Sequence, residues 1–347
     1  MVKTLFIVLD VLLLIFILVV LRIYTLTTHR QPDDKKKTFP DKNISGDKEP
    51  FASVIRAGRN WYNEQEKQTV RMKSFDDLII KAHFIPAQNS KGTILLAHGY
   101  MSDGITDFAY LYRYLHDLGY DLLNIFQRGC GLSAGQTYML GVGERIDIFA
   151  WATYLANGTA KEKDIFIFGM GMGGAAALMS SSLGLPENVR GIIAEAPFTS
   201  AWEEMKYELK GKLGFLTTPV LYTVDGLCRW RGKFSLRDGN ASDSVKESQL
   251  PILLFHGEAD KVVPASMSEE IYAAASGEKE MLTVPNAGHL TSFMTDETSC
   301  RTKLEEFLNR YSFTPAGTLH QGSGDDENDE GKQKAERGNG ITAVRNS

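Results

Sequence analysis

The chain has little cysteine, little proline and no excess of positive charge. Its three cysteines, Cys130, Cys228 and Cys300, are too few and too scattered for a disulfide framework or a zinc cluster. Eleven prolines and 32 glycines in 347 residues, 43% of them hydrophobic, exclude collagen and a fully disordered chain. The formal net charge of -5 provides no positive field for a nucleic-acid backbone. We therefore expect a globular protein with no nucleic-acid partner, and we assign it no metal.

The longest apolar run lies at the N-terminus. Residues 5–21 are apolar except for Asp10, which approaches the ~20 residues that a helix needs to cross a bilayer. A cleaved secretory signal is the main alternative, but no small-residue cleavage site follows Leu21. We predict an uncleaved, single-pass anchor in the cell membrane over residues 4–27. Most nearby Lys and Arg follow the run, which favours a cytoplasmic domain, but large domains often depart from this tendency and both sides stay open.

Changes in composition mark the limits of one domain. Residues 28–50 are polar, carry Pro32 and Pro40, and are typical of a solvated linker. Residues 314–347 lose the apolar pattern and carry an acidic run, which is typical of a disordered tail. We expect the folded domain over residues 51–313 and assign no chemistry to the linker or the tail.

Short apolar runs alternate with amphipathic stretches of helical length in this domain. The first two runs, 69–73 and 78–84, predict a hairpin that turns at Asp76 and Asp77. Further strands are expected at 93–97, 121–125, 164–168, 191–194, 252–255 and 281–284. Helices are expected at 107–118, 144–155, 172–182, 267–275 and 302–311. The alternation predicts an α/β fold with a doubly wound, mainly parallel sheet that binds ligands at the carboxyl ends of its strands.

One segment interrupts the alternation. Residues 198–248 separate two predicted strands and are too long for a plain connection, so we predict a helical cap. The cap contains large apolar side chains that either form its own small core or contact a ligand: Trp202, Met205, Tyr207, Phe215, Tyr222 and Trp230.

The sequence after residues 164–168 has the setting of a nucleophile elbow. Gly169, Gly171 and Gly173 alternate with methionines before a predicted helix. In a G-x-S-x-G elbow the glycines let a strand bend sharply into a helix, and the central side chain stands where backbone N–H groups stabilise an oxyanion. Here the central position is Gly171. The methionines are typical of core packing.

Two later segments offer a carboxylate and an imidazole. Asp260 follows the strand predicted at 252–255, and His289 lies on the loop after the next strand. The order of elbow, acid and base is the Ser, Asp, His order of α/β-hydrolases. Alternatively, Asp260 is a simple turn residue and His289 a structural loop histidine.

These motifs give the chain a resemblance to a known family. From about residue 69 to 311 it resembles the α/β-hydrolase superfamily, in the branch of serine aminopeptidases, monoglyceride-lipase-like esterases and membrane-anchored hydrolases of Gram-positive bacteria. The similar segments are, in order, His98-Gly99-Tyr100, Arg128 to Gly135, His256 to Asp260, and Gly288-His289. The resemblance implies that Asp260 orients His289 and that the N–H groups of Tyr100 and Met172 form an oxyanion hole.

The resemblance fails at three positions. The family's nucleophile aligns with Gly171, its Asp before the Arg-Gly run aligns with Phe126, and the His within that run aligns with Cys130. A literal G-x-S-x-G occurs at residues 131–135, but its Ser133 precedes the elbow strand. We interpret Ser133 as unrelated to the nucleophile.

The missing hydroxyl decides the functional prediction. Loss of the nucleophile from a comparable triad costs on the order of 10⁶ in kcat. Glycine relaxes the strained elbow backbone, so the fold and the pocket should survive. We predict that serine-type hydrolysis is lost and that the pocket still binds a small acyl, ester or peptide-like ligand without a cofactor. The alternatives are an active hydrolase of carboxylic esters or amides, through water activated by His289 or because Gly171 is a variant of an active parent, and a protein-interaction scaffold.

Overall fold

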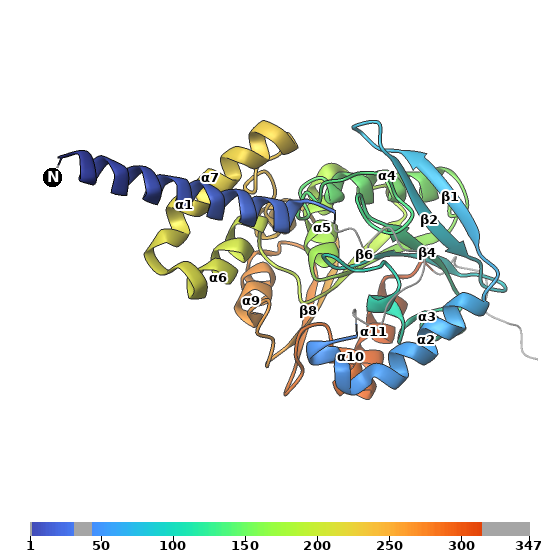
Figure 1. Ribbon diagram of the computed structural model, residues 1–347. Coiled ribbons are helices and arrows are strands. Elements are labelled where there is room, and N and C mark those ends of the chain that lie inside the picture. The colour runs from blue at the N-terminus through green and yellow to red at the C-terminus, as the bar shows by residue number, and fades with distance from the viewer. Residues whose placement is uncertain (1, 31–43, 314–347) are drawn as a thin grey trace, which may run out of the picture. The chain divides into compact units, whose positions relative to one another are not determined.

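Eight strands form one mainly parallel sheet in the computed structural model, which describes residues 2–30 and 44–313. The strand order is β1-β2-β4-β3-β5-β6-β7-β8. The hairpin of β1 (Gln68–Lys73) and β2 (Ile79–Ile85) is antiparallel and joins β4 in antiparallel register. The other neighbours are parallel: β3 (Gly92–Ala97), β4 (Tyr120–Phe126), β5 (Asp164–Met170), β6 (Val189–Glu195), β7 (Ile252–Gly257) and β8 (Lys279–Val284) (Figure 1). The predicted hairpin and doubly wound sheet are confirmed.

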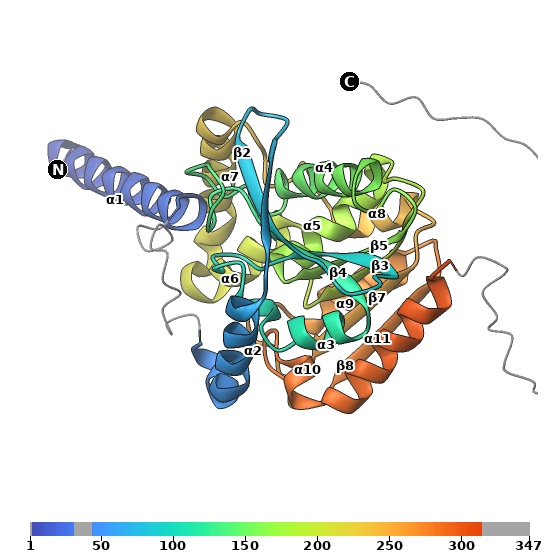
Figure 2. The ribbon, with the colours of Figure 1, turned by 90° about the vertical axis from the view of Figure 1, so that its right-hand side faces the viewer.

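Helices cover both faces of the sheet (Figure 2). One face carries α4 (Glu144–Asn157), α5 (Met172–Ser180), α8 (Ala241–Glu247) and α9 (Ala265–Ala274). The other carries α2 (Ala52–Glu64), α3 (Tyr112–Asp117), α10 (Ser292–Thr295) and α11 (Glu297–Tyr311). Each face of the sheet has its own hydrophobic core. In β3, Leu95 packs in the core on the first face, whereas Ile94 and Leu96 pack in the core on the second face. Because successive side chains of a strand point to opposite faces, a strand covered on both sides is apolar at consecutive positions.

The helix predicted at 107–118 is shorter in the structure. A 3-10 turn, η4 (Thr106–Phe108), comes first, and α3 begins only at Tyr112. The Asp103 carboxylate accepts the N–H groups of Ile105 and Thr106 at 2.8 and 2.6 Å. Such side-chain bonds to nearby backbone favour a turn over a continuous helix.

The cap is also shorter than the predicted 198–248. It consists of α6 (Ala201–Leu213), η6 (Gly214–Leu216), α7 (Thr217–Leu227) and a π-turn, η7 (Cys228–Gly232). Helix α8 lies outside the cap, because its Ala241 and Val245 are buried in the same core as α5. Asn240 caps α8 by accepting the N–H groups of Ser242 and Asp243 at 2.8 and 3.2 Å. The chain thus returns to the sheet layer about ten residues before the next strand.

Helix α1 (Val2–Thr28) contains the N-terminal apolar run. It is long and apolar enough to cross a membrane, a test that a signal sequence also passes. Its buried residues Val20 and Tyr24 share a cluster with Val220 and Leu221 of α7. At its end the N–H of Tyr138 donates to Thr28 O at 2.7 Å, and that of Arg30 to Gln136 O at 2.9 Å. The end of α1 is therefore fixed to the loop before α4.

Candidate active site

The elbow joins β5 to α5 at Gly171, which has φ 52° and ψ −116°. This backbone conformation strains any residue other than glycine. The flanking glycines permit close packing, since a Cβ on Gly169 would lie 2.3 Å from Gly173 O and one on Gly173 2.1 Å from Ala97 O. A Cβ on Gly171 would meet nothing nearer than Nε2 of His289, at 3.7 Å. The position is thus sterically open and faces the imidazole.

Asp260 and His289 form a hydrogen-bonded pair. Nδ1 of His289 lies 2.8 Å from Oδ2 of Asp260, whose side chain is buried. Oδ1 of Asp260 accepts the N–H groups of Val262 and Val263 at 2.8 and 3.0 Å. Burial alone would raise the pKa of Asp260, but hydrogen bonds from His256 and His289 outweigh it and hold the pKa well below its usual range. An ionised Asp260 favours a proton on Nδ1 of His289 and leaves Nε2, which faces Gly171, free to accept one.

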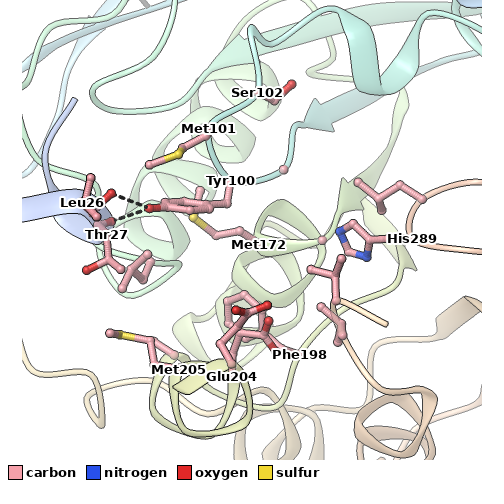
Figure 3. A pocket seen from close by; sticks show the side chains of 18 of the residues that line it. Leu26, Thr27, Tyr100, Met101, Ser102, Met172, Phe198, Glu204, Met205 and His289 are labelled. Atoms are coloured by element: carbon pink, nitrogen blue, oxygen red, sulfur yellow. Dashed lines mark hydrogen bonds between the residues drawn. The ribbon is translucent and has the colours of Figure 1, made fainter. Parts of the chain in front are cut away.

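The two residues predicted for the oxyanion hole lie on the same cavity as Gly171 and His289. Met172 is the first residue of α5, and the first N–H groups of a helix have no acceptor within it. Tyr100 follows Gly99 after β3, and its hydroxyl donates to Thr27 O at 2.8 Å (Figure 3). The structure therefore places both Tyr100 and Met172 beside the elbow. The role of their backbone N–H groups as an oxyanion hole stays a prediction.

The cavity has a volume of about 710 Å³. Its walls come from the end of α1, the cap helix α6 and the loops around the elbow and His289, as Figure 3 shows. Most of the lining is apolar, including Ile23, Leu26, Leu140, Phe198, Met205, Leu209 and Val263. A concave, mainly apolar site of this size can enclose an organic ligand.

Most of the cap's large side chains pack or face outward instead of lining this cavity. Of the six noted in the sequence, Met205 lines it. Trp202 and Tyr222 contact each other edge to face at 5.1 Å, and the Arg237 guanidinium lies 3.7 Å from the centre of the Trp202 ring. Phe215 is 89% exposed and Trp230 is 70% exposed. Neither alternative thus holds for all six: Met205 and Trp202 belong to the cap cluster, Met205 also lines the cavity, and the other four are exposed.

Glu204 is a cavity residue that the sequence analysis missed. It lies on α6, and its carboxylate is turned into the cavity (Figure 3). Among the described residues, its buried Oε2 atom has no hydrogen-bond partner. Burial, followed by repulsion from Glu208 and Asp260, raises the pKa of Glu204 to about 8. No sequence pattern pointed to Glu204, because acidic residues are common in the first turn of exposed helices.

Other candidate residues have structural contacts. Ser133 donates its hydroxyl to Phe126 O at 2.5 Å and accepts Lys81 N–H at 2.8 Å, which agrees with its exclusion as nucleophile. The three cysteines are buried, and none of them lines the cavity. Within residues 2–30 and 44–313, no hydroxyl or thiol bonds to the His289 ring, and no group of three His, Cys, Asp or Glu side chains could hold a metal.

A sheet of this order, an elbow after β5, an acid after β7 and a histidine after β8 together define an α/β-hydrolase. The chain belongs to the α/β-hydrolase superfamily. The family model described as serine aminopeptidase, S33, matches residues 88–225, and that described as TAP-like protein matches residues 224–318.

Similar proteins come from bacteria, archaea and vertebrates. The chain is 26% identical to YqkD of Bacillus subtilis, over 71% of this chain and 81% of YqkD. It is 26% identical to the lysophosphatidylserine lipase ABHD12 of Danio rerio, over 60% of this chain but only 52% of ABHD12, about half its length. An esterase from Pyrococcus furiosus has a TM-score of 0.58 at 20% identity, over 71% of this chain and 92% of the esterase. That structural likeness concerns the fold alone.

Proposed function

We propose that this chain is a membrane-anchored protein of the esterase and lipase type in which serine-nucleophile chemistry has been lost and the ligand cavity retained. The observation that carries the proposal is the Gly171 position. A Cβ there would lie 3.7 Å from Nε2 of His289, and the same imidazole is bonded to Asp260 at 2.8 Å. This is the arrangement of a triad in which the base and the acid remain and the nucleophile has no side chain.

The chemistry that remains follows from these contacts. No acyl-enzyme can form on glycine, because no oxygen or sulfur atom is available to attack a carbonyl carbon. The N–H groups of Tyr100 and Met172 would still receive a carbonyl or carboxylate oxygen, and the apolar walls would enclose an acyl chain. The ligand class that fits best is an acyl compound, an ester or a peptide-like molecule.

Anchoring through α1 is part of the proposal. The first half of the helix exposes almost only apolar side chains, including Leu5, Phe6, Ile7, Leu12 and Leu13. Its last two turns contribute Ile23, Leu26 and Thr27 to the cavity wall. An anchor so placed would hold the cavity close to the membrane surface, where amphiphilic acyl compounds concentrate.

The test compares the unaltered chain with Gly171→Ser and with Gly171→Ala as the matched control. Short-chain p-nitrophenyl esters are offered to each full chain in detergent micelles. We expect Gly171→Ser to exceed the unaltered chain by about 10²-fold or more in kcat/KM, because it restores the attacking oxygen. Gly171→Ala should stay at the level of the parent. Esterase turnover by the unaltered chain that survives His289→Ala, or no gain in Gly171→Ser, would contradict the proposal.

A second candidate function is slow hydrolysis by activated water. The space beside Gly171 is open to Nε2 of His289, so a water bound there could lose its proton to the imidazole while it attacks an ester carbonyl. General-base assistance of this kind accelerates a reaction about 10²- to 10⁴-fold. Turnover in the unaltered chain that disappears in His289→Ala and Asp260→Asn would favour it.

A further inference from the structure

Residues 44–51, directly before α2, lie against two loops of the site. Their turn η3 (Gly46–Phe51) belongs to the stretch predicted as a solvated linker. We propose that Asp47 and Lys48 of η3 are positioning residues that brace the His289 loop and the Gly99 loop. This proposal rests on the proposed function in one respect: it takes these two loops to be walls of the ligand site.

Asp47 holds the backbone of His289. Its Oδ2 accepts the N–H of His289 at 2.7 Å. The preceding residue must be small, because a Cβ on Gly288 would lie 2.3 Å from the same oxygen. On the other side of the loop, Glu195 accepts the N–H of Ser292 at 2.8 Å. Three carboxylates therefore fix the base: Asp260 holds its ring, Asp47 its backbone and Glu195 the end of its loop.

Lys48 acts on the Gly99 loop through Asp107. Its Nζ lies 2.5 Å from Oδ1 of Asp107, and the two side chains are only 14% and 5% exposed. The other oxygen of Asp107 accepts the N–H of Gly99 at 2.8 Å, directly before Tyr100. Burial alone would raise the pKa of Asp107, but Lys48 and the Gly99 N–H outweigh it and hold the pKa well below its usual range. Lys48 thus keeps Asp107 ionised as an acceptor for the loop that carries the predicted oxyanion donor.

The segment has other attachments that would survive a change at either residue. Ile44 is buried in a small cluster with Ile55 and Ala109. In α2, the Arg59 guanidinium lies 3.1 Å from the carboxylate of Asp103, which is on the same loop as Tyr100. Substitution of Asp47 or Lys48 should therefore loosen one wall of the site without unfolding the domain.

The direct test is amide hydrogen exchange on the full chain in detergent micelles. Asp47→Ala should speed exchange of peptides containing His289 about tenfold, and Lys48→Met should do the same for peptides containing Gly99. Asp47→Asn and Lys48→Arg should restore most of the protection, because each conserves its hydrogen bond. Glu49→Gln, an exposed neighbour on η3, is the matched control and should change neither region. Unchanged exchange at both loops, or faster exchange throughout the domain, would overturn the proposal.

A kinetic readout distinguishes bracing from a merely structural role. In the Gly171→Ser background, Asp47→Ala should lower kcat for ester hydrolysis about tenfold with KM within about twofold, because the imidazole is misplaced while the apolar wall persists. Asp47→Asn should recover most of that loss, and a uniform loss in both variants would contradict bracing. If Gly171→Ser has no turnover at all, the proposed function fails, while the exchange experiment still decides the role of Asp47 and Lys48.

Discussion

Single residues decide the chemistry of this cavity. Gly171 stands at the predicted nucleophile position, where a Cβ would have no contact closer than 3.7 Å. Asp260 and His289 keep the bond that a catalytic pair needs, at 2.8 Å. Glu204 adds a carboxyl group that the triad does not require, turned toward the same space. The cavity therefore combines a hydrogen-bonded Asp–His pair, a glycine at the predicted nucleophile position and a carboxyl group with a raised pKa.

The raised pKa of Glu204 makes a prediction about stability and pH. The folded chain retains the Glu204 proton up to a pKa of about 8, whereas an unfolded chain releases it near the ordinary glutamate pKa of 4.5. The folded state then binds more protons between these values, so the contribution of Glu204 to stability falls as pH rises from about 4.5 to 8. Between pH 5 and pH 8 the raised pKa of Glu204 should lower the free energy of unfolding by about 3–4 kcal/mol. We expect Glu204→Gln to remove this decrease, as measured by denaturant unfolding at both pH values. Glu203→Gln, its exposed neighbour, should keep the decrease; equal pH dependence in both variants would show that Glu204 is not the group.

At the scale of elements, the segment resembling the Arg-Gly motif stabilises the loop between β4 and α4. Arg128 is almost fully buried and donates to Asp147 at 2.8 and 2.9 Å and to Ser74 at 3.0 Å. It also reaches Asp76, in the turn of the hairpin, at 2.9 Å. The motif thus connects the hairpin, the loop and α4 around one guanidinium, a structural role that does not depend on a nucleophile.

Arg128→Met should destabilise the domain strongly. The change leaves the buried Asp147 without its counter-charge, which typically costs about 3–5 kcal/mol. Arg113→Met removes an exposed pair with Asp117 and should cost less than about 1 kcal/mol. Thermal unfolding of both variants measures the difference. The double variant Arg128→Met with Asp147→Asn should be more stable than Arg128→Met alone; no recovery would mean that the charge is not the cause.

At the scale of the whole molecule, the sequence predicted the sheet better than the surroundings of the site. Consecutive apolar positions, as in Ile94, Leu95 and Leu96, identify strands buried on both faces. Motif order brought Asp260 and His289 together, because acid and base follow neighbouring strands of this fold. The cap boundary and the bracing segment depended on contacts between distant residues, such as Asp47 with His289. In the sequence, the short charged stretch around Asp47 cannot be told from a solvated linker, because its partner His289 lies 242 residues away.

The helix α1 makes a prediction about the intact protein. If α1 is an uncleaved anchor, the chain should stay with membranes after alkaline carbonate washing and dissolve only in detergent. Intact-mass spectrometry of the extracted protein should give the mass of a chain that still contains residues 2–28. A mature chain that lacks this segment and appears in the soluble fraction would identify α1 as a cleaved signal instead.

We propose that no residue of the unaltered chain can carry an acyl-type adduct. Fluorophosphonates phosphonylate activated serines, so intact-mass spectrometry after exposure to such a probe counts reactive nucleophiles directly. We expect no adduct on the unaltered chain, and one adduct per molecule on Gly171→Ser that disappears when His289→Ala is added. Stoichiometric labelling of the unaltered chain, lost in His289→Ala, would contradict the account and identify a nucleophile elsewhere in the cavity.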